Sequence, residues 1–277
     1  MMTEYKIACE GVKKKVIYHF NDSHLTEWDG ESSEAERENA QKCTESWERV
    51  RADYARGYGE PYEAKQKLAP AKHFENLLAE AKKGDALVIA GDMMDYVSPA
   101  NVRFCERTLG GFAKPFVAVC GNHENAAEIP ADSVISGMRE PVQTLDLGDL
   151  LIIGLDNSRR SVTQAQNEEL ERLLSCGKKA VVAMHVPIMC PANEAQLKPN
   201  GVYFQFNYEG CPRENLDCIE IIKSHGKDIA AVLAGHLHYL NTANLTKDLF
   251  QFVASQGIVG NMNRYVIGDR DEIRRVR

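Results

Sequence analysis

The sequence lacks both an excess of positive charge and a long apolar run. Its 277 residues include 33 Lys and Arg against 40 Asp and Glu, which gives a formal net charge of −7. This balance argues against a broad surface for nucleic acid or anionic membrane. No apolar run approaches the roughly 20 residues that cross a bilayer, and the opening segment has no apolar core of a secretory signal. We therefore expect a cytoplasmic protein that acts on small molecules; the oligomeric state stays open.

The chain also lacks a paired-cysteine motif. Its eight cysteines show no C-x-x-C spacing and no regular framework, so we expect reduced thiols. Cys120 and Cys190 lie near candidate site residues in the sequence, but a small buried side chain is the simpler interpretation of each. Internal repeats and low-complexity tracts are absent as well. The length allows one domain with a large core, and we expect a single domain over residues 1–277.

What the sequence does have is an alternation of apolar strands and amphipathic helices. Apolar runs predict strands at residues 16–20, 86–90, 116–119, 151–155, 180–184 and 229–234. Apolar residues at helical spacing predict helices at 70–83, 163–174 and 213–224. This alternation indicates an α/β fold. Residues 144–156 look like two strands joined by a Gly-Asp turn, and residues 248–255 and 264–269 add further strands, so a second, partly antiparallel sheet is expected.

One long charged segment, residues 27–68, interrupts this pattern after the first predicted strand. Within it, Trp47, Val50 and Tyr54 form a narrow apolar stripe at helical spacing. We interpret the segment as an inserted helical element. Such stripes usually pack on the body of a protein, and we prefer that interpretation to ligand binding.

Polar residues follow five of the apolar runs. They are Asp22 and His24, then Asp92 and Asp95, then Asn122, His123 and Glu124, then His185, and finally His236 and His238. Taken singly, each has a plain explanation, because Gly-Asp and Gly-Asn form turns and a His-x-His pair can be solvated or hydrogen-bonded. Taken together, they would place a cluster of unpaired polar groups at one edge of a sheet. Bound metal ions are the simplest explanation.

Seven side chains form the candidate ligand set: Asp22, His24, Asp92, Asn122, His185, His236 and His238. Nitrogen and oxygen donors without a thiolate disfavour a closed structural zinc site and suit a catalytic site with open positions. Seven ligands are too many for one ion. If one carboxylate bridges, they divide over two ions about 3.5–4 Å apart, the spacing of two-metal hydrolases. The donors suit Mn, Fe, Zn, Co or Ni equally, so the two divalent metals stay unassigned.

The order D-x-H, GD-x-x-D, GNHE, H and GH-x-H resembles the calcineurin-like metallophosphoesterase superfamily, over residues 22–238. The segment "GLDNSRR" followed by "TQAQNEELERLL" is more loosely similar to its cyclic-nucleotide phosphodiesterase branch. The resemblance implies a sandwich of two β-sheets flanked by helices, with the metals at the carboxyl ends of strands. It also implies the division of ligands, with Asp22, His24 and His238 on one ion, Asn122, His185 and His236 on the other, and Asp92 bridging.

Such a site predicts hydrolysis of phosphate esters. Two divalent ions that share a water lower its pKa toward neutrality, so that a metal-bridging hydroxide can attack phosphorus. Asn122 is expected to bind a metal and also to touch the phosphate. His123 follows a ligand without being assigned as one, which makes it the candidate general acid; a structural hydrogen bond to a ligand is the alternative. The resemblance gives Asp95 the role of orienting His123 and raising its pKa.

The expected substrate class depends on two missing arginines. Protein phosphatases of this superfamily carry an Arg after the GD-x-x-D block and another before GNHE, where this sequence has Tyr96 and Cys120. A monoanionic diester needs less positive charge than a dianionic monoester, so we expect a phosphodiesterase acting on a small or nucleotide substrate. A phosphomonoesterase is the alternative enzyme, since Arg103, Arg159 or Arg160 could reach the site. A third possibility is a scaffold on this fold that binds partners and has lost catalysis. Such a protein should have lost some ligands, whereas here every ligand position is filled.

The loop after His185 is rich in aromatic residues. It carries Tyr203, Phe204, Phe206 and Tyr208. These rings could wall the pocket and stack on a nucleobase, or they could pack on the core, and the sequence favours neither.

Overall fold

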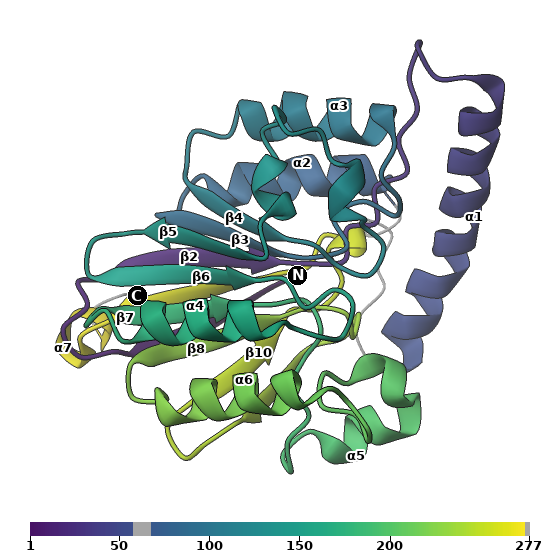
Figure 1. The fold of residues 1–277 in the computed structure, drawn as a ribbon. Helices are drawn as coiled ribbons and strands as arrows, with labels where there is room; N and C mark the ends of the chain where they lie inside the picture. The colour runs from purple at the N-terminus through teal and green to yellow at the C-terminus, as the bar shows by residue number, and fades with distance from the viewer. Residues whose placement is uncertain (58–67, 275–277) are drawn as a thin grey trace.

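The computed structural model describes residues 1–57 and 68–274. Within them, two mixed β-sheets pack face to face, with helices on their outer sides (Figure 1). In spatial order, the first sheet contains β1 (Met2–Ala8), β11 (Met262–Gly268), β2 (Lys15–Phe20), β3 (Ala86–Ala90) and β4 (Phe116–Val119). The second contains β5 (Val142–Asp146), β6 (Leu150–Leu155), β7 (Lys179–Ala183), β8 (Ile229–Ala234), β10 (Phe250–Val253) and β9 (Asn241–Asn244). The predicted α/β class and the sandwich of two sheets are confirmed.

The central strands of each sheet run parallel. In the first sheet, β2, β3 and β4 pair in parallel, and in the second, β6, β7, β8 and β10 do so. The antiparallel pairs are β2 with β11, β5 with β6, and β9 with β10. Parallel neighbours bring their carboxyl ends to one edge of a sheet. The residues that follow β2, β3, β4, β7 and β8 therefore gather at one end of the sandwich.

The inner faces of the two sheets form an apolar layer. Side chains of one sheet, such as Val88 and Val117, belong to the same buried cluster as Ile152, Val181 and Leu233 of the other. Alternate residues of a strand point to opposite faces, so the strands of each sheet present a second apolar side outward. Helices cover these outward sides.

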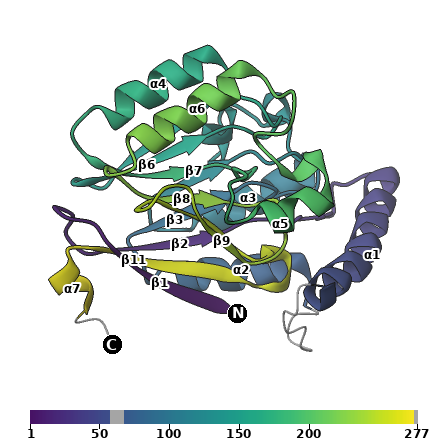
Figure 2. The ribbon, with the colours of Figure 1, turned by 90° about the horizontal axis from the view of Figure 1, so that it is seen from below.

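The outer helices form a layer on each side of the sandwich. On the first sheet lie α2 (Pro70–Ala81) and α3 (Pro99–Gly110), and α2 contributes Phe74 and Leu77 to their shared core (Figure 1). On the second sheet lie α4 (Gln164–Leu174) and α6 (Arg213–Ser224) (Figure 2). A capping box between Thr163 and Gln166 begins α4 and satisfies two backbone N–H groups that the helix itself leaves free.

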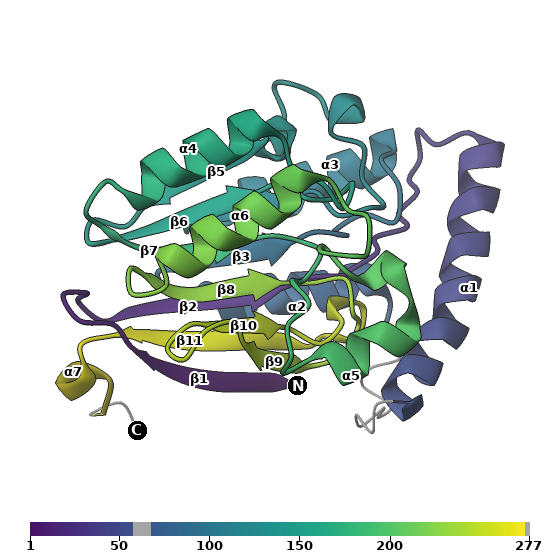
Figure 3. The ribbon, with the colours of Figure 1, turned by 60° about the horizontal axis from the view of Figure 1, so that its bottom comes forward.

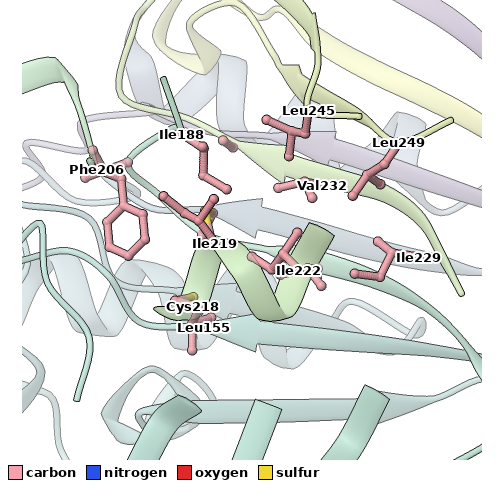
Figure 4. Close-up of a cluster of buried hydrophobic side chains, with 14 of the residues drawn as sticks. Leu155, Ile188, Phe206, Cys218, Ile219, Ile222, Ile229, Val232, Leu245 and Leu249 are labelled. Carbon is pink, nitrogen blue, oxygen red and sulfur yellow. The ribbon is translucent and has the colours of Figure 1, made fainter. Parts of the chain in front are cut away.

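The core beneath α6 also anchors a loop. Cys218, Ile219 and Ile222 of α6 lie over Val232 of β8, and the ring of Phe206 inserts at the edge of this cluster (Figure 4). Phe206 is fully buried, and its backbone N–H donates to the carbonyl of Pro187 at 3.1 Å. Phe206 belongs to the loop of residues 198–208, which follows the short helix α5 (Glu194–Leu197). These contacts hold the loop against the end of the sandwich.

Helix α1 (Glu34–Gly57) forms most of the described part of the predicted 27–68 insertion. It stands beside the carboxyl ends of the strands, away from the two helical layers (Figures 1 and 3). Residues 58–67 lie outside the described part of the chain. The insertion follows the second strand and not the first, because β1 precedes β2. The sequence analysis missed β1, since its residues alternate between exposed and half-buried and form no apolar run.

Two further observations concern the chain as a whole. No helix among residues 1–57 and 68–274 is long and apolar enough to span a membrane. All eight cysteines lie among these residues as free thiols. Burial raises the pKa of the Cys120 thiol, with the charge of Glu124 adding to the effect, and this thiol donates to the carbonyl of Met138 at 3.2 Å. Cys120 thus acts as a small buried side chain, as its sequence position led us to expect.

Candidate metal centre

The turns that follow the strands have an unusual backbone. Five residues there adopt positive φ angles although none is glycine: Asp22, His24, Asp92, His236 and His238, with φ between 42° and 72°. A left-handed conformation costs roughly 1–2 kcal/mol for such residues. Cross-strand hydrogen bonds hold the turns, since Asp22 N donates to Gly91 O and His24 N donates to Asp92 O, each at 3.0 Å. The sandwich thus keeps in place a strained edge from which these side chains project.

One group of donor atoms gathers around the end of β2. Nε2 of His238 lies 3.1 Å from Oδ1 of Asp22 and 3.1 Å from Nε2 of His24. Nε2 of His24 lies 3.9 Å from Oδ2 of Asp92. All four side chains are buried, and their ligand atoms lie within 4.8 Å of one another. The group is compact enough to hold one metal ion.

A second group lies beside the first and shares Asp92 with it. Nε2 of His185 lies 3.3 Å from Oδ2 of Asp92, 3.1 Å from Nδ1 of His236 and 3.0 Å from Oδ1 of Asn122. The structure thus brings all seven sequence-predicted ligands together, in two groups with the membership that the family resemblance implies. Asp92 stands between the groups, in the position of a bridging carboxylate.

Hydrogen bonds at the outer ring nitrogens fix the tautomers of two histidines. Nδ1 of His185 lies 2.8 Å from the carbonyl oxygen of Ala90, and Nε2 of His236 lies 3.1 Å from that of Tyr203. A carbonyl only accepts, so these nitrogens carry the hydrogens. In the neutral rings, the two inner nitrogens then face each other with lone pairs 3.1 Å apart. A cation between them removes this conflict, so the residues fit a metal-binding role.

The charges in the site also call for a cation. Burial by itself would raise the pKa of Asp22, but His238 outweighs burial and lowers that pKa to about 2. Burial likewise opposes ionisation of Asp92, and His185 holds its pKa well below the ordinary value. Conversely, burial would lower the pKa of His185, but the charge of Asp92 raises it to about 10. Without a metal ion, the two ionised carboxylates would keep the His185 imidazole protonated. A bound ion would supply this positive charge instead, and His185 would then bind it as the neutral imidazole.

Three ring nitrogens surround the Asp95 carboxylate beside the first group, and the Trp47 nitrogen donates a hydrogen bond to it. Its Oδ1 lies 2.9 Å from Nδ1 of His123, 2.8 Å from Nε1 of Trp47 and 3.3 Å from Nδ1 of His24. An indole nitrogen only donates, so Trp47 occupies one lone pair of this oxygen. Burial lowers the pKa of His123, but the bond to Asp95 and the charge of Asp92 outweigh it and raise the pKa to about 9. The His123 side chain is 32% exposed.

Trp47 is a site residue that the sequence analysis did not identify. Its ring stacks on His24 with centroids 3.8 Å apart and lies 5.3 Å from the ring of His238. The stripe that contains Trp47 was expected to pack on the body, and Trp47 itself packs on candidate ligands there. The side chain of Tyr54, in the same stripe, lies outside the described part of the structure.

Glu124 connects the turns that carry two of the ligands. Its carboxylate accepts from the backbone N–H groups of Asp92 at 3.0 Å, Met94 at 2.8 Å and Gly121 at 2.7 Å. Burial and the charge of Asp92 raise its pKa to about 7. Glu124 therefore fixes the ends of β3 and β4 relative to each other.

The sequence matches a known family over most of its length. The model of the calcineurin-like phosphoesterase family matches residues 15–240. This chain belongs to the calcineurin-like phosphoesterases. As a member of that family it is a metal-dependent hydrolase of phosphoesters. No curated protein sequence matches this phosphoesterase.

Solved structures share the fold of this phosphoesterase. A dimetal phosphatase from Danio rerio is 11% identical with a TM-score of 0.60, over 90% of this chain and 91% of the other. The structure of PhoD is 13% identical with a TM-score of 0.50, over 91% of this chain and 58% of the other. At these identities the likeness concerns the fold alone.

Proposed function

We propose that this phosphoesterase holds two divalent ions and hydrolyses phosphodiesters of small molecules. The main observation behind this proposal is that two buried groups of donor atoms share Asp92. One ion is held by Asp22, His24, Asp92 and His238, and the other by Asp92, Asn122, His185 and His236. Mn, Fe, Zn, Co and Ni all suit this set of imidazole, carboxylate and amide donors. Ions bound there would activate a water molecule and neutralise charge on the phosphate.

The protein residues around the ions bind the substrate and move a proton. Asn122 lies at the edge of the second group, where its amide can contact a phosphate oxygen as well as a metal. His123 can donate the proton of Nε2 to the leaving oxygen, because Asp95 occupies its Nδ1 and fixes the ring orientation. Asp95 is itself oriented by Trp47 and His24. This chain of contacts supports a general acid at His123.

The charges around the site favour a diester over a monoester. Neither Tyr96 nor Cys120 supplies positive charge at the places where guanidinium groups would grip a dianion. Arg103 is bound elsewhere, with Nε and Nη2 on Asp29 at 2.8 Å and Nη1 on Glu31 at 3.2 Å. A monoanionic diester needs fewer such contacts.

The ester preference is tested by comparing bis-p-nitrophenyl phosphate with p-nitrophenyl phosphate in the presence of Mn²⁺, with metal-stripped protein as the control. We expect a higher kcat/KM for the diester. A strong preference for the monoester would replace the proposal with a phosphomonoesterase. If no ester is turned over with any of the five metals, the protein is a scaffold on this fold.

The ion assignment is tested by metal analysis of purified variants. Asp92→Ala should lower the bound metal by more than one ion per chain, because both groups use this carboxylate. His185→Ala should affect one ion only, and Asp146→Ala, at an exposed site away from both groups, should keep the full content. Equal metal content in the Asp92 and His185 variants would contradict the shared carboxylate.

A further inference from the structure

Arg160 is the one described non-glycine residue outside the ligand set that has a positive φ, at 57°. Two hydrogen bonds hold this conformation: Arg160 N donates to Asn157 O at 2.8 Å, and Arg160 O accepts from Nδ2 of Asn215 at 2.8 Å. The side chain of Asn157 in turn accepts from the backbone N–H of His185 at 2.9 Å. The strained turn is therefore connected directly to a residue of the second metal group. Strained residues of this kind persist where the surrounding structure holds them, and they cluster at active sites and ligand-binding segments.

The guanidinium of Arg160 is held on aromatic rings. It lies over Tyr208, with 4.7 Å from Cζ to the ring centroid, and over Tyr203, with 5.8 Å. Its Nη1 also donates to the carbonyl of Val202 at 3.1 Å. These contacts fix the short helix η5 (Val202–Phe204) relative to the turn that carries Arg160.

Tyr203 borders the second metal group with an open ring. Its carbonyl orients His236, and its ring centroid lies 4.9 Å from that of His236. The residue is nevertheless 48% exposed, whereas Phe206 of the same loop is fully buried. Phe206 and the partly buried Phe204 thus anchor the loop in the core, and core packing does not account for Tyr203. An aromatic ring that Arg160 holds in place and that is exposed beside the second metal group can serve as a stacking surface.

We propose that Tyr203, held in place by Arg160, binds the nucleobase of a nucleotide substrate. This proposal rests on the proposed function, since the ester phosphate must lie at the metal centre. A planar heterocycle stacks on an aromatic face and gains attraction from an adjacent guanidinium. Tyr203 is the residue that contacts the base, and Arg160 is a positioning residue that acts through Tyr203.

The test compares two diesters with the same leaving group, namely thymidine 5′-(p-nitrophenyl phosphate) and methyl p-nitrophenyl phosphate. We expect the wild-type kcat/KM to favour the nucleoside ester by roughly tenfold or more, the usual range for stacking of one base. Tyr203→Ala should bring the ratio close to one through a higher KM for the nucleoside ester, and Tyr203→Phe should retain it. Phe250→Ala removes a ring of similar exposure (42%) at the start of β10 and serves as the control.

Arg160→Gly separates the function of Arg160 from its backbone conformation. Glycine adopts positive φ without strain, so this variant should fold with no loss of melting temperature. The ratio of the two kcat/KM values should nevertheless fall toward one, because Tyr203 loses its support. A ratio near one in the wild type, or an unchanged ratio in both variants, would overturn the proposal.

Binding measurements keep this inference separate from the proposed function. Calorimetry with thymidine 5′-phosphate and with ribose 5-phosphate on the Mn²⁺-loaded protein needs no turnover. If neither diester is cleaved, the proposed function fails, and the base site still stands if the nucleotide binds more tightly and Tyr203→Ala removes the difference. Equal binding of the two phosphates refutes the base site, whatever the diesters show.

Discussion

His123 is the residue for which the structure offers a specific catalytic test. We expect His123→Ala to retain both metal ions and to slow turnover by roughly 10²–10⁴-fold, the usual contribution of a general acid. Metal analysis and steady-state kinetics on the same preparation measure the two effects. His225→Ala is the control, since that histidine pairs with Glu171 on the surface. Unchanged turnover would remove His123 from the mechanism.

Trp47 allows a second test at the same scale, because its indole N–H donates to the Asp95 carboxylate at 2.8 Å. Trp47→Phe keeps a ring over His24 and removes the donor. We expect kcat to fall by roughly tenfold with metal content unchanged, since a hydrogen bond to a charged group is lost while the contact between Asp95 and His123 remains.

Trp28→Phe is the matched control for this substitution. Trp28 is 54% exposed and contacts Arg37, so its replacement should leave kcat unaltered. The Trp28 variant also leaves Trp47 as the single tryptophan of the chain, and its fluorescence should respond to added Mn²⁺. Equal kinetics in the two variants would show that the bond to Asp95 has no catalytic importance.

There is a physical reason why the ligand residues could be predicted from the sequence and Trp47 could not. Each ligand directly follows an apolar strand, and parallel strands bring such positions together. Trp47 reaches the site from a helix whose apolar stripe has the same period whether it contacts a core or a ligand. The sequence could not decide whether Tyr203 lines the pocket or packs on the core. Its exposure, and not its residue type, distinguishes it from the buried Phe206.

At the scale of elements, the turn after β3 requires a residue without a side chain. Gly91 has φ 87°, and a Cβ there would lie 2.3 Å from Nδ1 of His185. Gly148 has φ 92° with nothing within 4 Å of the same position. Both alanine variants incur the left-handed cost of roughly 1–2 kcal/mol. Gly91→Ala must also displace the imidazole, so it should melt at a lower temperature than Gly148→Ala and lose metal. Equal melting temperatures and metal contents would contradict this contact.

Elements that bury a continuous apolar run were predicted almost to the residue. The bounds of β3, β4, β8 and α6 agree with the sequence analysis. The edge strands β1 and β9 were missed, since β1 alternates between exposed and half-buried residues and β9 buries only an asparagine and an alanine, so neither forms an apolar run. Helix α3 was also missed, although Ser98 accepts from Asn101 N as its N-cap and Pro99 begins it. That Ser-Pro pair was a usable signal.

At the scale of the whole molecule, bound metal should stabilise the folded state. A ligand at 100 times its Kd stabilises a protein by about 2.7 kcal/mol, which corresponds to roughly 5–10 °C in a chain of this size. We expect the chelated protein to melt several degrees lower and its Tm to rise with the logarithm of Mn²⁺ concentration. Calorimetry with EDTA and with graded Mn²⁺ measures this. A Tm independent of metal would contradict a folded-state centre of this kind.

Each group of donors takes members from both sheets. The first draws on the ends of β2 and β3 from one sheet and on His238, beyond β8, from the other, and the second is divided in the same way. The ions would consequently link two layers that are otherwise joined by apolar contact and a few side-chain hydrogen bonds, such as that from Gln143 to the carbonyl of Ala118. A chain cut between β4 and β5 would yield two fragments, neither of which carries a complete coordination sphere.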